Sequence, residues 1–304
     1  MPRPDTLDAS MSTRKTYQVL SATRDDAQGM ARPAIFGATD VGCVRNNNED
    51  QFLIAELERA LVLMQSGFPI TPGERLLDTP AWLLMVADGM GGHDAGELAS
   101  SVVVDAMTHY AFRLMPWLGT SSSSDAATVA AGLKDAAAAA QQHMREVAIR
   151  KGVSPELGTT LTMAYVRWPE CLVAHVGDSR GYLMREQELF RLTKDHNLAQ
   201  SMVRRGVLDE EEGRRSHFSS VLTNAFGGGS DELHVDLHHF HLQAGDRLLL
   251  CTDGLYGELG DSQIQATLAA CVNPSLTHFC VESLIHRAKR AGGRDNVTAI
   301  VASF

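Results

Sequence analysis

The sequence is short of cysteine, of positive charge and of long apolar runs, and each shortage excludes a class of protein. Its five cysteines are odd in number and form no CxxC pair, so we expect neither a disulfide framework nor a structural zinc site. This cysteine usage fits the reducing cytoplasm. No segment is long and apolar enough to span a membrane. At 44% hydrophobic and 21% charged residues, the composition is otherwise that of a globular protein.

Positive charge is outnumbered by negative charge. The 304 residues include 27 Lys and Arg against 37 Asp and Glu, which gives a formal net charge of −10. An acidic surface disfavours nonspecific binding to nucleic acids and to anionic lipids, so we expect neither nucleic acid nor membrane among the partners. Residues 1–33 mix charged with small polar side chains and are expected to form a solvated tail. Residues 34–304 are then the folded domain.

The apolar segments follow the order strands, two helices, strands, two helices, strand. This order predicts two packed sheets with a helix pair on each outer face. Residues 67–80, rich in proline and glycine, are interpreted as a connection, and a helix that begins near 95 is expected to end before Pro116. The expected strands are 34–40, 51–57, 60–66, 81–88, 158–168, 171–178, 180–186, 188–193, 233–242, 247–254 and 296–304, and the expected helices are 95–114, 126–151, 261–271 and 276–291.

Aspartates recur where the predicted buried strands end. Asp88 ends the run LLMVAD, Asp253 ends LLLCTD and Asp178 ends VAHVGD, while Asp295 and Asp50 stand just before strands. Strand ends hold side chains rigidly and can converge from distant parts of a sequence. Oxygen-rich clusters without thiols select hard cations such as Mg²⁺, Mn²⁺ or Ca²⁺. The sequence therefore predicts a carboxylate cation site.

Glycines and one arginine fit the same interpretation. Gly89 would let its carbonyl approach an ion, and Gly91 and Gly92 would allow a tight turn with positive φ before the helix. Arg45 stands four residues before Glu49, and a guanidinium beside a divalent-cation site can bind a phosphate group with two hydrogen bonds.

The motifs together resemble the metal-dependent protein phosphatases of the type 2C family, in its bacterial branch. The resemblance runs from about residue 34 to residue 304. Its motifs, in order, are TDVGCVRNNNED, VADGMGGHDAGELAS, GTTLTMAYV, AHVGDSRGYL, LTKDH, LTNAFGG, LLLCTDGLYGEL and GGRDNVTAIV. The resemblance implies an α+β fold, a four-layer α-β-β-α sandwich of two antiparallel sheets with flanking helix pairs, plus a flap at about residues 196–230.

The resemblance also implies a site that holds two Mn²⁺ or Mg²⁺ ions, and it assigns roles residue by residue. Asp88 would bridge both ions, the Gly89 carbonyl would bind one, and Asp253 and Asp295 would bind the other. Glu49 and Asp50 would act through ion-bound waters, and Arg45 would hold the substrate phosphate. A third, weaker ion would lie between Asp178 and Asp253, with Ser220 of the flap as a further ligand. The implied substrates are phosphorylated serines and threonines of proteins, including those of a cognate kinase.

Met90 departs from the pattern of the eukaryotic members, which carry a histidine there as the proposed general acid. A methionine cannot donate a proton. The expected proton source is then an ion-bound water, with His93 as the alternative.

Two other functions stay open at this point. A metal-dependent nuclease would share the carboxylates, although the acidic surface and the motif order argue against it. A degenerate domain that only binds phosphoproteins would be free to lose Asp88, Asp253, Asp295 and Arg45, all of which are present. Mn²⁺-dependent hydrolysis of p-nitrophenyl phosphate, reversed by EDTA, distinguishes a phosphatase from both.

Overall fold

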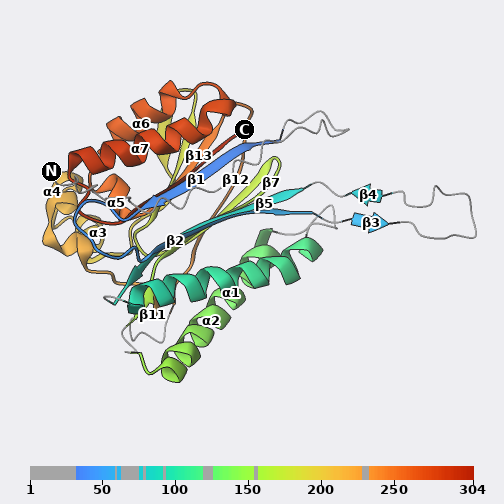
Figure 1. The fold of residues 1–304 in the computed structure, drawn as a ribbon, viewed down its shortest axis with the longest axis horizontal. Helices are drawn as coiled ribbons and strands as arrows, with labels where there is room; N and C mark the ends of the chain where they lie inside the picture. The colour runs from blue at the N-terminus through green and yellow to red at the C-terminus, as the bar shows by residue number, and fades with distance from the viewer. Residues whose placement is uncertain are drawn as a thin grey trace, which may run out of the picture.

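Two antiparallel sheets lie face to face, with helices on both outer faces (Figure 1). This architecture is seen in a computed structural model that describes residues 32–58, 60–62, 75–77, 80–91, 94–118, 126–153, 157–227 and 233–304. It confirms the predicted α-β-β-α sandwich.

Over the described residues the first sheet has five strands, which include the first and the last of the described strands. Its spatial order is β1 (Ala34–Asp40), β14 (Val297–Ser303), β13 (Arg247–Cys251), β9 (Arg180–Arg185) and β10 (Glu188–Arg191). All seven residues of β14 are buried, because this strand lies between β1 and β13 and is covered on both faces.

The second sheet has seven strands built around β5 (Ala81–Met90). Its remaining strands are β2 (Asp50–Leu57), β6 (Gly158–Thr159), β7 (Leu161–Arg167), β8 (Glu170–Val176), β11 (Phe226–Gly227) and β12 (Asp236–His241). The first seven residues of β5 are all buried, as its unbroken apolar run predicts. Both β2 and β7 pair with it in antiparallel register.

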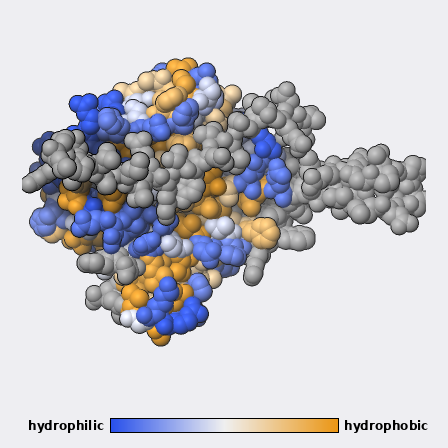
Figure 2. Space-filling view, in the orientation of Figure 1, coloured by the Kyte–Doolittle hydropathy of each residue, from blue (hydrophilic) through white to orange (hydrophobic). Residues whose placement is uncertain are grey.

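The core has three layers, one between the sheets and one under each helix pair. Trp82 and Leu84 of β5 meet Leu248 and Ile300 between the sheets. Helices α1 (Asp94–Leu118) and α2 (Ala126–Lys151) cover the second sheet, and α6 (Asp261–Ala270) and α7 (Thr277–Ala291) cover the first. On the face shown in Figure 2, hydrophilic residues are interspersed with smaller hydrophobic areas. None of the helices in the described ranges has the length and apolarity needed to cross a bilayer.

The structure corrects the sequence interpretation at two places. Helix α1 continues through Pro116 to Leu118, so the expectation that it ends before the proline was wrong. A proline has no N–H, so the last turn of α1 lacks the backbone hydrogen bond that residue 116 would otherwise donate. The presumed connection at 67–80 contains a short strand, β4 (Arg75–Leu77), which pairs with β3 (Ala60–Val62). The expected continuation of that earlier strand over 63–66 lies outside the described residues.

The expected tail lies almost entirely outside the described residues, which begin at Arg32. Arg32 bonds to Glu56 and Glu58, each at 3.1 Å, so the chain is already attached to the end of β2 at this point. The boundary of the domain at residue 34 stays a prediction.

Candidate functional site

Strand pairing places two of the predicted carboxylates side by side. Asp50 begins β2 and lies directly opposite Asp88 of β5 in the antiparallel ladder. The Asp50 side chain is only 2% exposed. Its Oδ2 accepts hydrogen bonds from Thr252 Oγ1 at 2.8 Å and from Thr298 Oγ1 at 2.6 Å, and both threonines belong to the other sheet layer. Asp50 therefore fixes this edge of the second sheet against the first.

The first sheet contributes the other two carboxylates. Asp253 follows β13 and opens the short helix α5 (Asp253–Tyr256), and Asp295 stands two residues before β14. Burial raises the pKa of Asp253, and the charge of Asp295 raises it further, while a hydrogen bond with Asp88 lowers it. The adjacent strands β13 and β14 thus bring the pair to the edge where Asp88 lies.

The carboxylates repel one another in a buried setting. Burial raises the pKa of Asp88 well above its ordinary value, and the charges of Asp253, Asp50 and Asp178 add to the shift. The pKa of Asp50 rises to about 7, with burial as the main cause. Buried like charges favour protonation or a bound cation. The cluster therefore has the electrostatics of a cation site.

Asp295 is also the partner of Arg45. Arg45 Nη2 donates to Asp295 Oδ2 at 2.7 Å, and the backbone N–H of Asn296 donates to Asp295 Oδ1 at 2.8 Å. Both oxygens are thus engaged. Over the described residues, no three acidic, histidine or cysteine side chains surround one point closely enough to hold an ion as they stand. Asp295 would have to move toward the other carboxylates to share an ion with them.

Two buried oxygens nevertheless fit a cation. Among the described residues, Asp50 Oδ1 and Asp253 Oδ1 are buried side-chain oxygens without a hydrogen-bond donor. Leaving a buried acceptor unpaired is costly, and a hard cation or its water would satisfy it. A set of ligands made only of oxygen atoms also favours hard cations. The residues present therefore fit Mg²⁺ or Mn²⁺.

Gly89 has a steric reason beyond the approach to an ion. A Cβ atom there would lie 2.1 Å from the Gly96 carbonyl oxygen and 2.7 Å from the Glu49 carbonyl oxygen. Its N–H donates to that Glu49 oxygen at 3.2 Å. Only glycine lets β5, the start of α1 and the Glu49 loop meet here. Gly91 has the expected positive φ, at 132°, whereas Gly92 lies outside the described residues.

Sequence reasoning missed Asn296, which holds the loop that carries Arg45 and Glu49. Its Nδ2 donates to the carbonyls of Val41 at 3.0 Å and Asn47 at 2.9 Å, and its Oδ1 accepts from the Glu49 N–H at 2.9 Å. The sequence signal was its position directly after Asp295 in GGRDN. The structure shows that this asparagine is buried.

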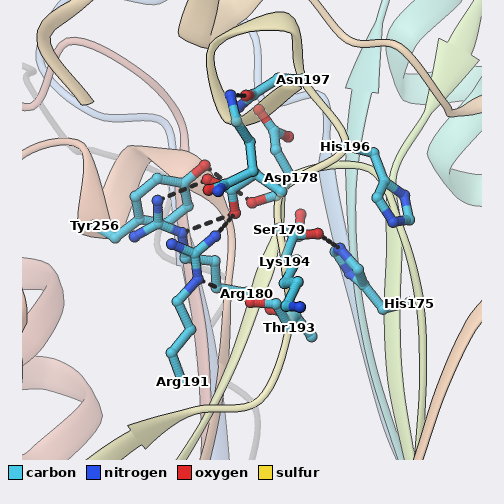
Figure 3. Close-up of polar contacts among 12 residues, drawn as sticks. His175, Asp178, Ser179, Arg180, Arg191, Thr193, Lys194, His196, Asn197 and Tyr256 are labelled. Carbon is cyan, nitrogen blue, oxygen red and sulfur yellow. Dashed lines mark hydrogen bonds and ion pairs between the residues drawn. The ribbon is translucent and has the colours of Figure 1, made fainter. Parts of the chain in front are cut away.

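Asp178 lies near Asp88 and Asp253, and its loop belongs to a second polar network (Figure 3). Burial raises the pKa of Asp178, and the charge of Asp253 is the next cause, so these two side chains are neighbours. Arg180, two residues on, donates to both oxygens of Asp195 at 3.0 and 2.7 Å. Tyr256 Oη donates to the Asp178 carbonyl at 2.9 Å. Arg180, Asp195 and Tyr256 were not predicted as site residues.

The predicted flap begins at His196 and contains α3 (Leu198–Arg204), α4 (Glu210–Arg215) and the 3₁₀ turn His217–Ser220. Ser220 is exposed, and its Oγ donates to the His217 carbonyl at 3.1 Å within that turn. The structure gives Ser220 this local role, and its part in an ion site stays a prediction. Residues 228–230, the end of the expected flap, lie outside the described ranges.

Met90 is the last residue of β5 and pairs with Gly158. The strand thus extends two residues past Asp88, because the short strand β6 continues the ladder. His93, the alternative proton donor, lies outside the described residues.

The arrangement agrees with a comparison against known families. A family model of protein phosphatase 2C matches residues 76–287. The chain belongs to the protein phosphatase 2C family. The match includes Asp88, Asp178 and Asp253, which the structure brings together.

Two curated relatives of this family are bacterial. The serine/threonine protein phosphatase PstP of Mycobacterium tuberculosis is 36% identical over 267 residues, which are 87% of this chain and 43% of PstP. The chain therefore spans less than half the length of that relative. The serine/threonine phosphatase stp of Listeria monocytogenes is 29% identical over 266 residues, covering 86% of this chain and 92% of the relative.

Solved structures of protein phosphatase 2C members share the fold. The M. tuberculosis PstP structure has a TM-score of 0.69 at 32% identity and covers 90% of this chain and 98% of its own. A serine/threonine phosphatase from S. agalactiae has a TM-score of 0.72 at 26% identity, with 90% and 99% coverage. A structure of the PstP catalytic domain in complex with two manganese ions has a TM-score of 0.68 at 31% identity, with 89% and 97% coverage.

Proposed function

We propose that this chain is a Mn²⁺- or Mg²⁺-dependent serine/threonine protein phosphatase. The observation that carries the proposal is the meeting of Asp50 and Asp88 from one sheet with Asp253 and Asp295 from the other, with Arg45 at the rim. The manganese-bound PstP structure supports the choice of metal.

The residues have separate tasks in this proposal. Asp88 would bridge two ions, with the Gly89 carbonyl on one and Asp253 and Asp295 on the other. When bound, the ions supply Lewis acidity toward water and toward the phosphate oxygens. Glu49 and Asp50 would accept hydrogen bonds from ordered waters and orient them.

Arg45 would donate to the phosphate once Asp295 releases it. Water attacks phosphorus in line, the serine or threonine oxygen leaves, and no side chain is phosphorylated. Because Met90 offers no proton, we expect water to protonate the leaving oxygen.

Hydrolysis of a phosphoserine peptide tests the proposal, with p-nitrophenyl phosphate as a second substrate. Activity should require Mn²⁺ or Mg²⁺, stop with EDTA and return with excess metal. Hydrolysis in ¹⁸O-labelled water should place one labelled oxygen in the phosphate on single turnover. Metal-independent activity, or none with any metal, would contradict the proposal. Cleavage of DNA or RNA instead would favour the nuclease, and phosphopeptide binding without turnover would favour the non-enzymatic domain.

The proposed function extends to a third ion, to protein partners and to a location. A third ion would lie at Asp178 and Asp253, because these carboxylates are neighbours. Phosphorylated proteins are the proposed partners. A cognate serine/threonine kinase and its substrates would be among them. A cytoplasmic location rests on the cysteine usage alone. Phosphoproteomics of a deletion strain would identify the substrates.

A further inference from the structure

The loop that carries Asp178 is attached to the rest of the molecule on two sides. On one side the Gly177 N–H donates to His196 Nδ1 at 3.1 Å, and the His196 N–H donates to the Gly177 carbonyl at 2.7 Å. On the other side the Asp178 carbonyl accepts the hydroxyl proton of Tyr256. The first attachment leads to the flap, and the second leads to α5.

Tyr256 is the last residue of the four-residue helix that Asp253 begins. Its hydroxyl is therefore a direct link between the backbone of Asp178 and the turn that carries Asp253. Burial and the nearby Asp178 raise the pKa of Tyr256, so the phenol keeps its proton and donates it. Asp178 and Asp253 are far apart along the chain, since one follows β8 and the other follows β13. The Tyr256 hydrogen bond therefore connects two segments that the backbone does not join directly.

The ring of Tyr256 is held in place by Arg180. The guanidinium carbon lies 3.5 Å from the ring centroid, within the range of a cation–π contact (Figure 3). Arg180 is itself fixed, because Asp195 accepts two of its hydrogen bonds and Tyr182 Oη accepts a third at 3.0 Å. Arg180 also belongs to the strand that follows the Asp178 loop. The stack and the hydroxyl bond thus clamp α5 onto this loop.

We propose that Tyr256 is a positioning residue that sets the separation of Asp178 and Asp253 and so the affinity for the weaker ion between them. The inference rests on the proposed function for that ion. Tyr256 reaches the site through the backbone of Asp178 and has no contact with the substrate in this role. Residues that orient metal ligands from behind typically change metal affinity by about 10- to 100-fold when substituted.

Tyr182 supplies a matched control. It is a second tyrosine of the same network, and its hydroxyl accepts from Arg180 and donates to Asp261 Oδ1 at 3.1 Å. Tyr256→Phe and Tyr182→Phe each remove one buried hydroxyl beside Arg180. Only the first removes a hydrogen bond to Asp178.

The experiment is a titration of the chelated proteins with Mn²⁺, in which free Mn²⁺ is followed by electron paramagnetic resonance. Tyr256→Phe should weaken only the weakest binding class, by about tenfold. Its tighter ions should bind as in the wild type, and Tyr182→Phe should stay within about twofold of the wild type for every ion. The melting temperature in EDTA, measured for both variants, separates this change from a general loss of stability.

Three results with the variants would overturn the inference. These are an unchanged weakest class in Tyr256→Phe, an equal loss in Tyr182→Phe, and an equal weakening of all ions. A wild type that binds Mn²⁺ without a weaker class would also overturn it, while leaving the proposed phosphatase intact. A wild type that binds no Mn²⁺ would overturn the proposed function and this inference with it.

Discussion

Arg45 and Asp295 form an ion pair at 2.7 Å although they lie 250 positions apart in the sequence. The pair joins the loop after β1 to the residues before β14, and its members are the proposed phosphate donor and a proposed ion ligand. A cation that binds Asp295 would weaken its ion pair with Arg45 and leave Arg45 available for the substrate phosphate. A phosphate bound to Arg45 would in turn leave Asp295 available for a cation.

Arg45→Ala should raise KM for a phosphopeptide by about 10- to 100-fold, as expected for the loss of charge-assisted hydrogen bonds. It should lower kcat much less, since the arginine holds the phosphate in the ground and transition states alike. Arg294 is a suitable control, because it is next to Asp295 but pairs with Glu258 at 2.8 Å. Steady-state kinetics at saturating Mn²⁺ measure both variants. A loss in kcat with KM unchanged would make Arg45 a transition-state group instead.

Asp88→Asn and Asp253→Asn should each lower kcat by at least about 100-fold, because each removes a proposed ion ligand. Both variants should keep or exceed the wild-type melting temperature in EDTA, since they remove repulsion from a buried cluster. Asp246→Asn is the control and should lose stability while keeping its turnover. Asp246 lies outside the site, is 2% exposed, and pairs with Arg185 at a distance of 2.6 Å. Near-normal turnover in the first two would disprove the assigned metal centre.

The metal-free protein should lose stability as the pH rises from about 4 to about 7. The pKa of Asp50 is raised to about 7, so in this window the folded state binds more protons than the unfolded state. His175 acts in the opposite direction, because burial lowers its pKa to about 3. As the pH falls below the ordinary pKa of histidine, the unfolded state binds a proton that the folded state does not, and the protein loses stability.

Comparing the wild type with Asp50→Asn isolates the first effect, since His175 is common to both. The melting temperature in EDTA should fall more steeply with pH in the wild type. Excess Mn²⁺ should flatten the wild-type curve, because a cation favours the ionised carboxylates. Parallel curves for the two proteins in EDTA would show that Asp50 titrates normally.

Gly89→Ala should destabilise the fold by about 1–3 kcal/mol, because the new methyl group would overlap two carbonyl oxygens in a packed region. Gly181→Ala is the matched control, since a Cβ in this buried strand would meet its nearest neighbour at 3.4 Å, an ordinary contact. Urea unfolding of both variants compares them directly. Equal stabilities would mean that the Glu49 loop and α1 yield at no cost.

The sequence predicted the layers because the apolar runs of β5, β13 and β14 are short and bounded by turn residues, which favours buried strands over helices. The aspartates at the ends of these runs were found for the same reason. The Arg180–Tyr256 stack could not be predicted, because it depends on how the start of β9 meets the end of α5. The partners of Asp295 were also out of reach, since an ion pair over 250 positions leaves no local pattern.

The pairing of β1 with β14 has a consequence for synthesis. Ala34 lies opposite Ser303, so β1 can pair in the first sheet only after β14 has been synthesised. Asp50 and Asp88 leave the ribosome well before Asp253 and Asp295, and contacts between distant segments form late. A nascent chain therefore carries half of the charge cluster, without the repulsion or the chemistry of the whole. The proposed hydrolase can therefore form its site only after β14 has joined the first sheet.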